Sequence, residues 1–212
     1  MEWSSDIINR ILVGACAVTM ILAARKFVLM FPLVWASVLR RKKAEVIFEN
    51  IHLSGERDLL SAVCILPFCL VTARFALFRP EFFESFSEGE ITLLTAGAFI
   101  AWILLRGLLY LLIAPGKNMS DEWKLARSLS RNHLVVTTVL LLATAGILTI
   151  LDVDPESARR VLLWLIALAY LMLLRQKMEI IASRYSHFKA FLYLCALEGV
   201  TSSVLIFVTV YL

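Results

Sequence analysis

The chain has 212 residues, of which 60% are hydrophobic and 18% are charged, and its mean hydropathy is +0.83. Soluble domains are about 45–50% apolar and about 25% charged, so this composition excludes an ordinary soluble domain and indicates an integral membrane protein. The formal net charge is +4. However, the basic residues lie in short clusters between apolar runs, as topology signals do, so we expect no nucleic-acid partner. The apolar runs occupy most of the chain, which predicts one all-α membrane domain over residues 1–212.

The N-terminal region offers two apolar stretches of different length. Residues 7–24 are long enough to cross a bilayer, which needs about 20 residues, provided that Asn9 and Arg10 lie at the interface. Residues 27–39 are too short to cross alone. We expect them to extend the first helix or to lie as an interfacial helix, with a bend at Pro32.

Five further apolar stretches predict transmembrane helices. The fifth of the six predicted spans continues past Arg175 and Lys177 as one helix. If residues 7–24 do not cross, five spans remain as the alternative to six. The later spans are predicted at about 59–78, 91–115, 134–151, 161–182 and 190–212.

The distribution of basic residues predicts the orientation. With six spans, the first, third and fifth connections share one side and carry fifteen of the 21 basic residues. The positive-inside rule places these connections in the cytoplasm and both termini on the periplasmic side. The fifteen residues are Arg25, Lys26, Arg40, Arg41, Lys42, Lys43, Arg57, Lys117, Lys124, Arg127, Arg131, Arg175, Lys177, Arg184 and Lys189.

Four consecutive basic residues, Arg40, Arg41, Lys42 and Lys43, begin the connection after the first apolar region. Such a cluster attracts anionic lipid by about 1 kcal/mol per basic residue, which predicts contact with lipid headgroups. The alternative interpretation is a plain determinant of topology.

Ionisable residues within predicted spans are costly and are the first places to look for function, and two of them stand out, Arg106 and Glu198. From the ends of their helices, we place Arg106 roughly 13 Å deep and Glu198 roughly 12 Å deep, at 1.5 Å per residue. Matched depths predict an ion pair between the third and sixth spans. That pair could hold the bundle in register, or it could relay protons or ions; the sequence leaves both readings open.

Three neighbouring residues could extend this pair into a polar cluster. Tyr110 lies one helical turn after Arg106, while Tyr193 and Cys195 precede Glu198 on the last predicted helix. Aromatic residues at this depth also serve as interface anchors, which is the competing interpretation.

No cofactor, metal site or catalytic constellation is expected. The four cysteines lie in apolar runs without CxxC spacing, which favours small buried side chains. His52, His133 and His187 are assigned to connections on the cytoplasmic side, but they lack HxxxH or HExxH spacing. We therefore predict no catalytic residues, no bound metal and no cofactor.

The closing sequence LYLCALE, from Leu192 to Glu198, resembles the end of a bacterial membrane-protein family, domain of unknown function 4271. The resemblance extends more loosely to Arg106, to Asn132 before the next span, and to Phe48–Asn50. It implies a polytopic protein of the bacterial inner membrane and imports no known activity. The sequence departs from the family pattern after Glu198, where Gly199 stands near the usual position of a proline.

The leading functional hypothesis is a non-enzymatic accessory or scaffold subunit of a cell-envelope or secretion assembly. Expected partners are the lipid bilayer and either another membrane protein or a second copy of the chain. A small ion-coupled transporter using Arg106 and Glu198 is the first alternative. The second is a membrane enzyme acting on lipid-linked substrates, with His187, Tyr193 and Glu198 as its candidate residues.

Overall fold

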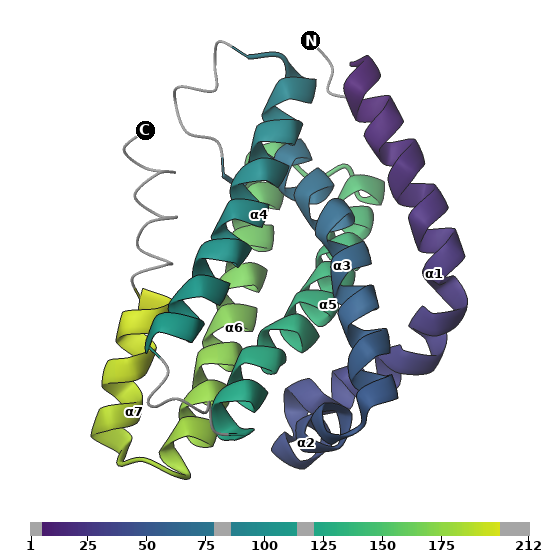
Figure 1. Cartoon of the computed structure of the whole chain (residues 1–212). Coiled ribbons are helices and arrows are strands. Elements are labelled where there is room, and N and C mark those ends of the chain that lie inside the picture. Colours follow the sequence, from purple (N-terminus) through teal and green to yellow (C-terminus); the bar gives the residue numbers. More distant parts are fainter. Residues whose placement is uncertain (1–5, 79–85, 114–120, 200–212) are drawn as a thin grey trace.

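The computed structural model describes residues 6–78, 86–113 and 121–199, and the regular structure in these ranges is entirely helical (Figure 1). The predicted all-α fold is therefore confirmed. In chain order the helices are α1 (Ile7–Leu39), α2 (Arg41–Glu49), α3 (Ile51–Arg74), α4 (Glu88–Ile113), α5 (Asp121–Ile150), α6 (Pro155–Ala182) and α7 (His187–Leu194), and a π-helical turn, η3 (Cys195–Gly199), follows α7.

Polar side chains cap the helix starts. The Asp6 carboxylate accepts a hydrogen bond from the Ile8 N–H at 2.8 Å, and the Asn50 side chain accepts one from the His52 N–H at 3.0 Å. Each cap satisfies a backbone donor that the first helical turn leaves unpaired. Asp6 also accepts the Gly89 N–H at 3.0 Å, which fixes the start of α1 beside the start of α4. A Cβ at Gly89 would lie 2.5 Å from the Asp6 carboxylate, so this contact requires glycine.

The two apolar stretches of the N-terminal region form one continuous helix of 33 residues. Of the two predicted arrangements for residues 27–39, the structure has the helix extension. Pro32 lies inside α1, and the helix curves in its second half (Figure 1). Proline removes one backbone donor and crowds the preceding turn, which accounts for curvature without a break.

Four helices, α1, α4, α5 and α6, are long and apolar enough to cross a membrane, which suggests membrane insertion. The predicted count of about six spans is not confirmed. The α3 helix is not among the four. Its first turns contain the charged residues Glu56, Arg57 and Asp58, which leaves too short an apolar stretch to cross. Of the predicted last span, α7 and η3 cover residues up to 199, and the remainder lies outside the described residues.

The predicted span at 134–151 corresponds only to the second half of α5, which begins at Asp121. Asp121 and Glu122 in the first turn favour this earlier start, because acidic groups stabilise the positive end of the helix dipole. The consequence is that Arg127, Arg131 and His133, which the sequence placed in a connection, are helical residues of α5.

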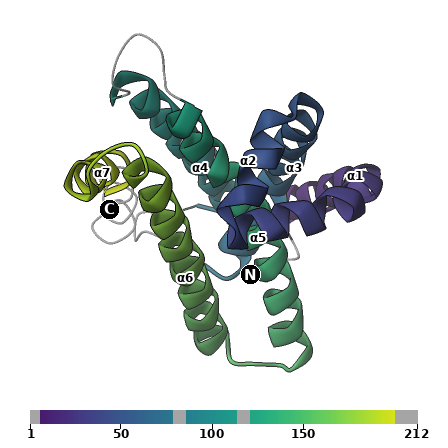
Figure 2. The same ribbon diagram turned by 90° about the horizontal axis from the view of Figure 1, so that it is seen from below.

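Of the four apolar helices, α5 is the most enclosed. In its most apolar stretch of 18 residues, 39% of the residues are buried, compared with 11–17% in α1, α4 and α6. It packs against α6 on one side and against α3 and α1 on the other. Figure 2 shows that the helices splay apart instead of running parallel. Large apolar side chains such as Ile21, Leu22 and Val28 are exposed on α1, as expected for a surface that faces lipid.

Candidate functional site

A buried ionic network joins α4, α6 and η3, and we call it the Glu198 network: Arg106, Tyr110, Lys177 and Glu198. The Glu198 Oε1 atom accepts hydrogen bonds from Arg106 Nη2 at 2.5 Å and from Lys177 Nζ at 2.5 Å. The Tyr110 hydroxyl donates to the same oxygen at 3.1 Å and accepts from Lys177 Nζ at 2.8 Å. One carboxylate oxygen therefore holds donors from two helices.

The network is closed to solvent. The exposed fractions are 0% for Lys177, 1% for Glu198, 2% for Tyr110 and 8% for Arg106. Two bases face one carboxylate, so full ionisation would leave a surplus of one positive charge in a region of low dielectric. Such a group is held in place only by close geometry and multiple hydrogen bonds, because the desolvation of each ion costs several kcal/mol.

The π-helical turn sets the direction of Glu198. A π-turn contains one more residue than an α-turn and frees backbone groups from the regular ladder. The Tyr170 hydroxyl on α6 donates to the Glu198 carbonyl oxygen at 3.3 Å, which satisfies one backbone acceptor in this turn. The side chain and the backbone of Glu198 are thus both tied to α6.

Arg106 has contacts on a second side. Its Nη2 atom donates to the Ser130 hydroxyl on α5 at 2.9 Å, and its guanidinium carbon lies 5.1 Å from the Trp102 ring centroid. A cation over an aromatic face is stabilised electrostatically, more strongly where water is excluded. Arg106 therefore connects α4 to α5 as well as to η3.

The structure brings together only part of the predicted polar cluster. Arg106, Tyr110 and Glu198 are in direct contact, whereas Tyr193 packs edge-on against Trp123 with ring centroids 5.3 Å apart. Cys195 is exposed. Tyr193 therefore belongs to the aromatic packing around Trp123, and Cys195 lies on the surface.

Lys177 is the member of the network that the sequence analysis missed. The sequence placed Lys177 among the basic residues of the cytoplasmic side that determine topology, although the fifth predicted span continues across it. The structure places Lys177 inside α6 with no exposed surface. The sequence could have indicated this role, because Lys177 lies within the span predicted at 161–182, and a lysine inside a span needs a buried partner.

A second set of polar contacts links α1, α5 and α6. Asn132 donates to the Ser37 hydroxyl at 2.9 Å, and both residues are buried. His133 hydrogen-bonds Gln176 at 3.2 Å, and the Gln176 amide donates to the Val38 carbonyl oxygen. Hydrogen bonds between apolar helices fix their register, so these contacts position α6 along α5. His133, predicted to lie in a connection, is a buried residue of this set.

A third group, the Asp58 cluster, consists of Arg57, Asp58 and Arg131. Arg57 Nη2 lies 2.7 Å from Asp58 Oδ1, and Arg131 Nη1 contacts Asp58 Oδ2. Arg57 also donates to the Ser54 hydroxyl at 2.8 Å. Burial lowers the pKa of the Arg57 guanidinium from its ordinary value, and the hydrogen bond to Asp58 opposes this effect.

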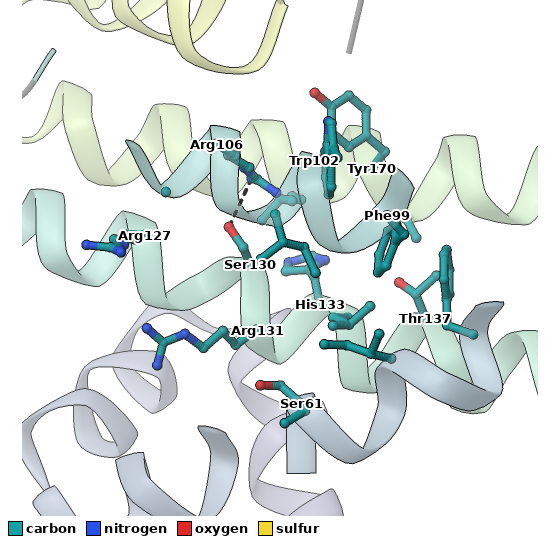
Figure 3. A pocket seen from close by; sticks show the side chains of 18 of the residues that line it. Ser61, Phe99, Trp102, Arg106, Arg127, Ser130, Arg131, His133, Thr137 and Tyr170 are labelled. Carbon is teal, nitrogen blue, oxygen red and sulfur yellow. Dashed lines mark hydrogen bonds between the residues drawn. The ribbon is translucent and has the colours of Figure 1, made fainter. Parts of the chain in front are cut away.

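A cavity of about 310 Å³ lies between α3, α4, α5 and α6, and we call it the Arg127 pocket (Figure 3). It forms where α4, which packs on α3 and η3, stands away from α5. Figure 3 shows Arg127 and Arg131 at one end, Arg106 with Ser130 in the middle, and Phe99 at the other end. The cavity is therefore cationic at one end and aromatic at the other.

The remaining predicted residues lie away from the network. Arg40 is the C-cap of α1. In α2, Arg41 pairs with Glu45 at 2.8 Å, and Lys42 and Lys43 are exposed. Contact of this group with lipid headgroups stays a prediction.

The residues proposed for an enzyme do not converge. His187 is exposed at the start of α7, about three helical turns before the buried Glu198. Within the described ranges, no three His, Cys, Asp or Glu side chains gather as metal ligands would.

These features define the class of protein: an all-α chain whose apolar helices suggest a membrane protein, with ion pairs enclosed between them. The family model described as "Domain of unknown function (DUF4271)" matches residues 10–200. The chain belongs to this family, as the sequence predicted. No curated protein and no solved structure matches the chain.

Proposed function

We propose that this chain is a non-enzymatic subunit of a membrane assembly of the cell envelope or of secretion, and that its Glu198 network is a structural lock. The observation that carries the proposal is that Lys177 and Glu198 are buried and line none of four cavities in the described part of the chain. A carrier needs its ion-binding carboxylate to reach water in some state. Here the carboxylate is enclosed by three donors.

One observation favours a second function, an ion-coupled transporter. Lys177, Tyr110 and Glu198 form a hydrogen-bonded triangle in which a proton could pass between basic and acidic groups. Buried ionisable chains of this kind serve as proton relays in pumps and carriers. Arg106 and Tyr110 also line the Arg127 pocket, which gives the triangle one neighbour that a ligand could reach.

Proton flux in proteoliposomes separates the two functions. We expect vesicles with the wild-type chain and vesicles with Glu198→Gln to show the same passive proton leak under an imposed pH gradient. Glu198→Gln keeps the hydrogen-bonding shape and removes the titrating group. A flux above that of empty vesicles that disappears in Glu198→Gln would establish the transporter and overturn the structural lock.

The subunit role needs a partner in native membranes. Cross-linking before mild detergent extraction, followed by mass spectrometry, is expected to yield one envelope protein at a fixed ratio to this chain. Recovery of the chain only as a monomer or as its own oligomer would contradict the accessory role.

The proposed topology has both termini in the periplasm of a bacterial inner membrane. Single cysteines in place of Lys42 and Glu84 are expected to react with an impermeant reagent from opposite sides. Labelling from the same side would contradict this arrangement.

A further inference from the structure

The Arg127 pocket has the chemistry of a binding site, and neither the family nor the proposed function assigns it a ligand. Its volume of about 310 Å³ falls at the lower end of the range for small-molecule sites, roughly 300–1,000 Å³. Most of its lining surface is apolar, with polar groups interspersed and three arginines toward one end, as is usual for such sites.

The cationic end holds a positive charge that has no partner among the residues the structure describes. Arg127 lines the pocket and has no hydrogen bond or ion pair with any residue that the structure describes. Its Nη2 atom would lie 3.6 Å from a Cβ placed at Gly107 of α4, so the guanidinium reaches across the cavity toward that helix. Arg131, at the same end, shares Asp58 with Arg57.

Two donors with no partner in the described part of the chain lie behind the wall of the pocket, on the lining residues Arg106 and Trp102. The Arg106 Nε atom and the Trp102 Nε1 atom are buried, and neither has a hydrogen-bond partner among the described residues. The side chain of Arg106 is 9% exposed, so this donor is almost fully removed from solvent.

Charge balance points in the same direction. The Glu198 network holds two bases against one carboxylate, and Arg127 adds a guanidinium in the adjoining cavity. An anion in the pocket would lower the electrostatic free energy of both groups.

The opposite end is suited to hydrocarbon. Phe68, Phe99, Leu134 and Ile166 line the pocket and pack in one apolar cluster, in which the Phe68 and Phe99 rings stack with centroids 4.7 Å apart. Thr137 and Tyr170 also lie at this end (Figure 3). A free inorganic anion would leave this half of the cavity empty. A ligand with an anionic head and an apolar tail would fill both halves.

We propose that the Arg127 pocket binds an amphiphile with one anionic head, a phosphate or carboxylate, beside Arg127 and Arg106, and a hydrocarbon tail toward Phe99. Anionic bilayer lipid is the source that we favour. The cationic end lies where α5 begins, the end that the charge pattern predicts to face the cytoplasmic leaflet and its anionic lipids. This inference goes beyond the proposed function, since lipid binding requires neither a partner subunit nor its absence.

The test uses the full chain in nanodiscs of equal phosphatidylglycerol and phosphatidylethanolamine, followed by native mass spectrometry of lipid retained on release. We expect one retained phosphatidylglycerol on the wild type. Arg127→Gln should weaken retention roughly tenfold, the effect of losing one hydrogen bond to a charged group. Arg160→Gln is the matched control, because it removes the same charge from an exposed residue paired with Glu156 outside the pocket.

A second variant tests the cavity without changing charge. Gly107 lines the pocket, and a leucine side chain there would occupy the space in front of Arg127. Gly107→Leu should therefore reduce retention as Arg127→Gln does, while circular dichroism shows unchanged helicity. If Arg127→Gln does not fold, the comparison of Gly107→Leu with the control decides the proposal.

Three outcomes would overturn the proposal. They are no preference for phosphatidylglycerol in the wild type, equal retention by the pocket variants and Arg160→Gln, and displacement of the lipid by millimolar inorganic phosphate. The last outcome would show that a free anion is the ligand and that the tail contributes nothing.

Discussion

The Glu198 network and the Asp58 cluster share one arrangement of charges but differ in their exposure to solvent. In each, one carboxylate lies between two basic side chains. The Glu198 side chain is 2% exposed and the Asp58 side chain is 39% exposed. An ion pair with access to water contributes about 0–1 kcal/mol, whereas loss of one partner from an enclosed pair costs about 3–5 kcal/mol. Burial, and not the residue types, decides how much each group contributes to stability.

The largest expected effect comes from removal of the enclosed carboxylate. Glu198→Leu leaves Arg106 and Lys177 as buried charges without a counter-ion, so we expect a loss of about 3–5 kcal/mol in the free energy of unfolding. Unfolding in mixed detergent micelles with increasing dodecyl sulfate measures this change. A loss below 1 kcal/mol would mean that the network does not lock α4, α6 and η3 together.

Removal of one cation from the same network should have a smaller effect. Lys177→Met leaves Arg106 and Glu198 as a balanced pair and removes the surplus positive charge. We expect a loss below about 2 kcal/mol, from the hydrogen bonds of Lys177 alone. The same unfolding measurement checks this order. A variant less stable than Glu198→Leu would show that Lys177, and not Glu198, organises the site.

The smallest expected effect is in the Asp58 cluster. Arg131→Gln breaks a half-exposed ion pair and should cost about 0.2–1 kcal/mol. The difference from wild type should shrink at 1 M salt, where the Debye length is about 3 Å. A loss that is large or independent of salt would remove the distinction between the two groups.

The sequence predicted the all-α fold and the family, and it placed Arg106 and Glu198 at one depth, where the structure pairs them. These inferences depend on hydropathy, a closing motif and the constant rise of a helix. Lys177 was missed because a lysine near the predicted end of a span is indistinguishable from a topology signal until the helix end is known. The predicted span at 134–151 covers only the apolar second half of α5, since the first turns of this helix are charged.

Two features could not follow from helical spacing. Cys195 precedes Glu198 by three residues, which an α-helix places near one face, but η3 interrupts the α-helical phase between them. The Arg127 pocket depends on how α4 leans away from α5, which is a property of packing between elements. Of its residues, only Arg106 and Tyr110 stood out from the sequence as a candidate site.

The central claim is that Arg106 and Glu198 form an energetic lock between helices, and a double-mutant cycle tests it most directly. Arg106→Leu, Glu198→Leu and the double variant would be unfolded reversibly in mixed micelles, with Lys177 unchanged throughout. The account predicts that the double variant loses about 2–3 kcal/mol less than the sum of the two single losses, as expected of residues in one ion-pair network. Losses that add to within about 0.5 kcal/mol would contradict it.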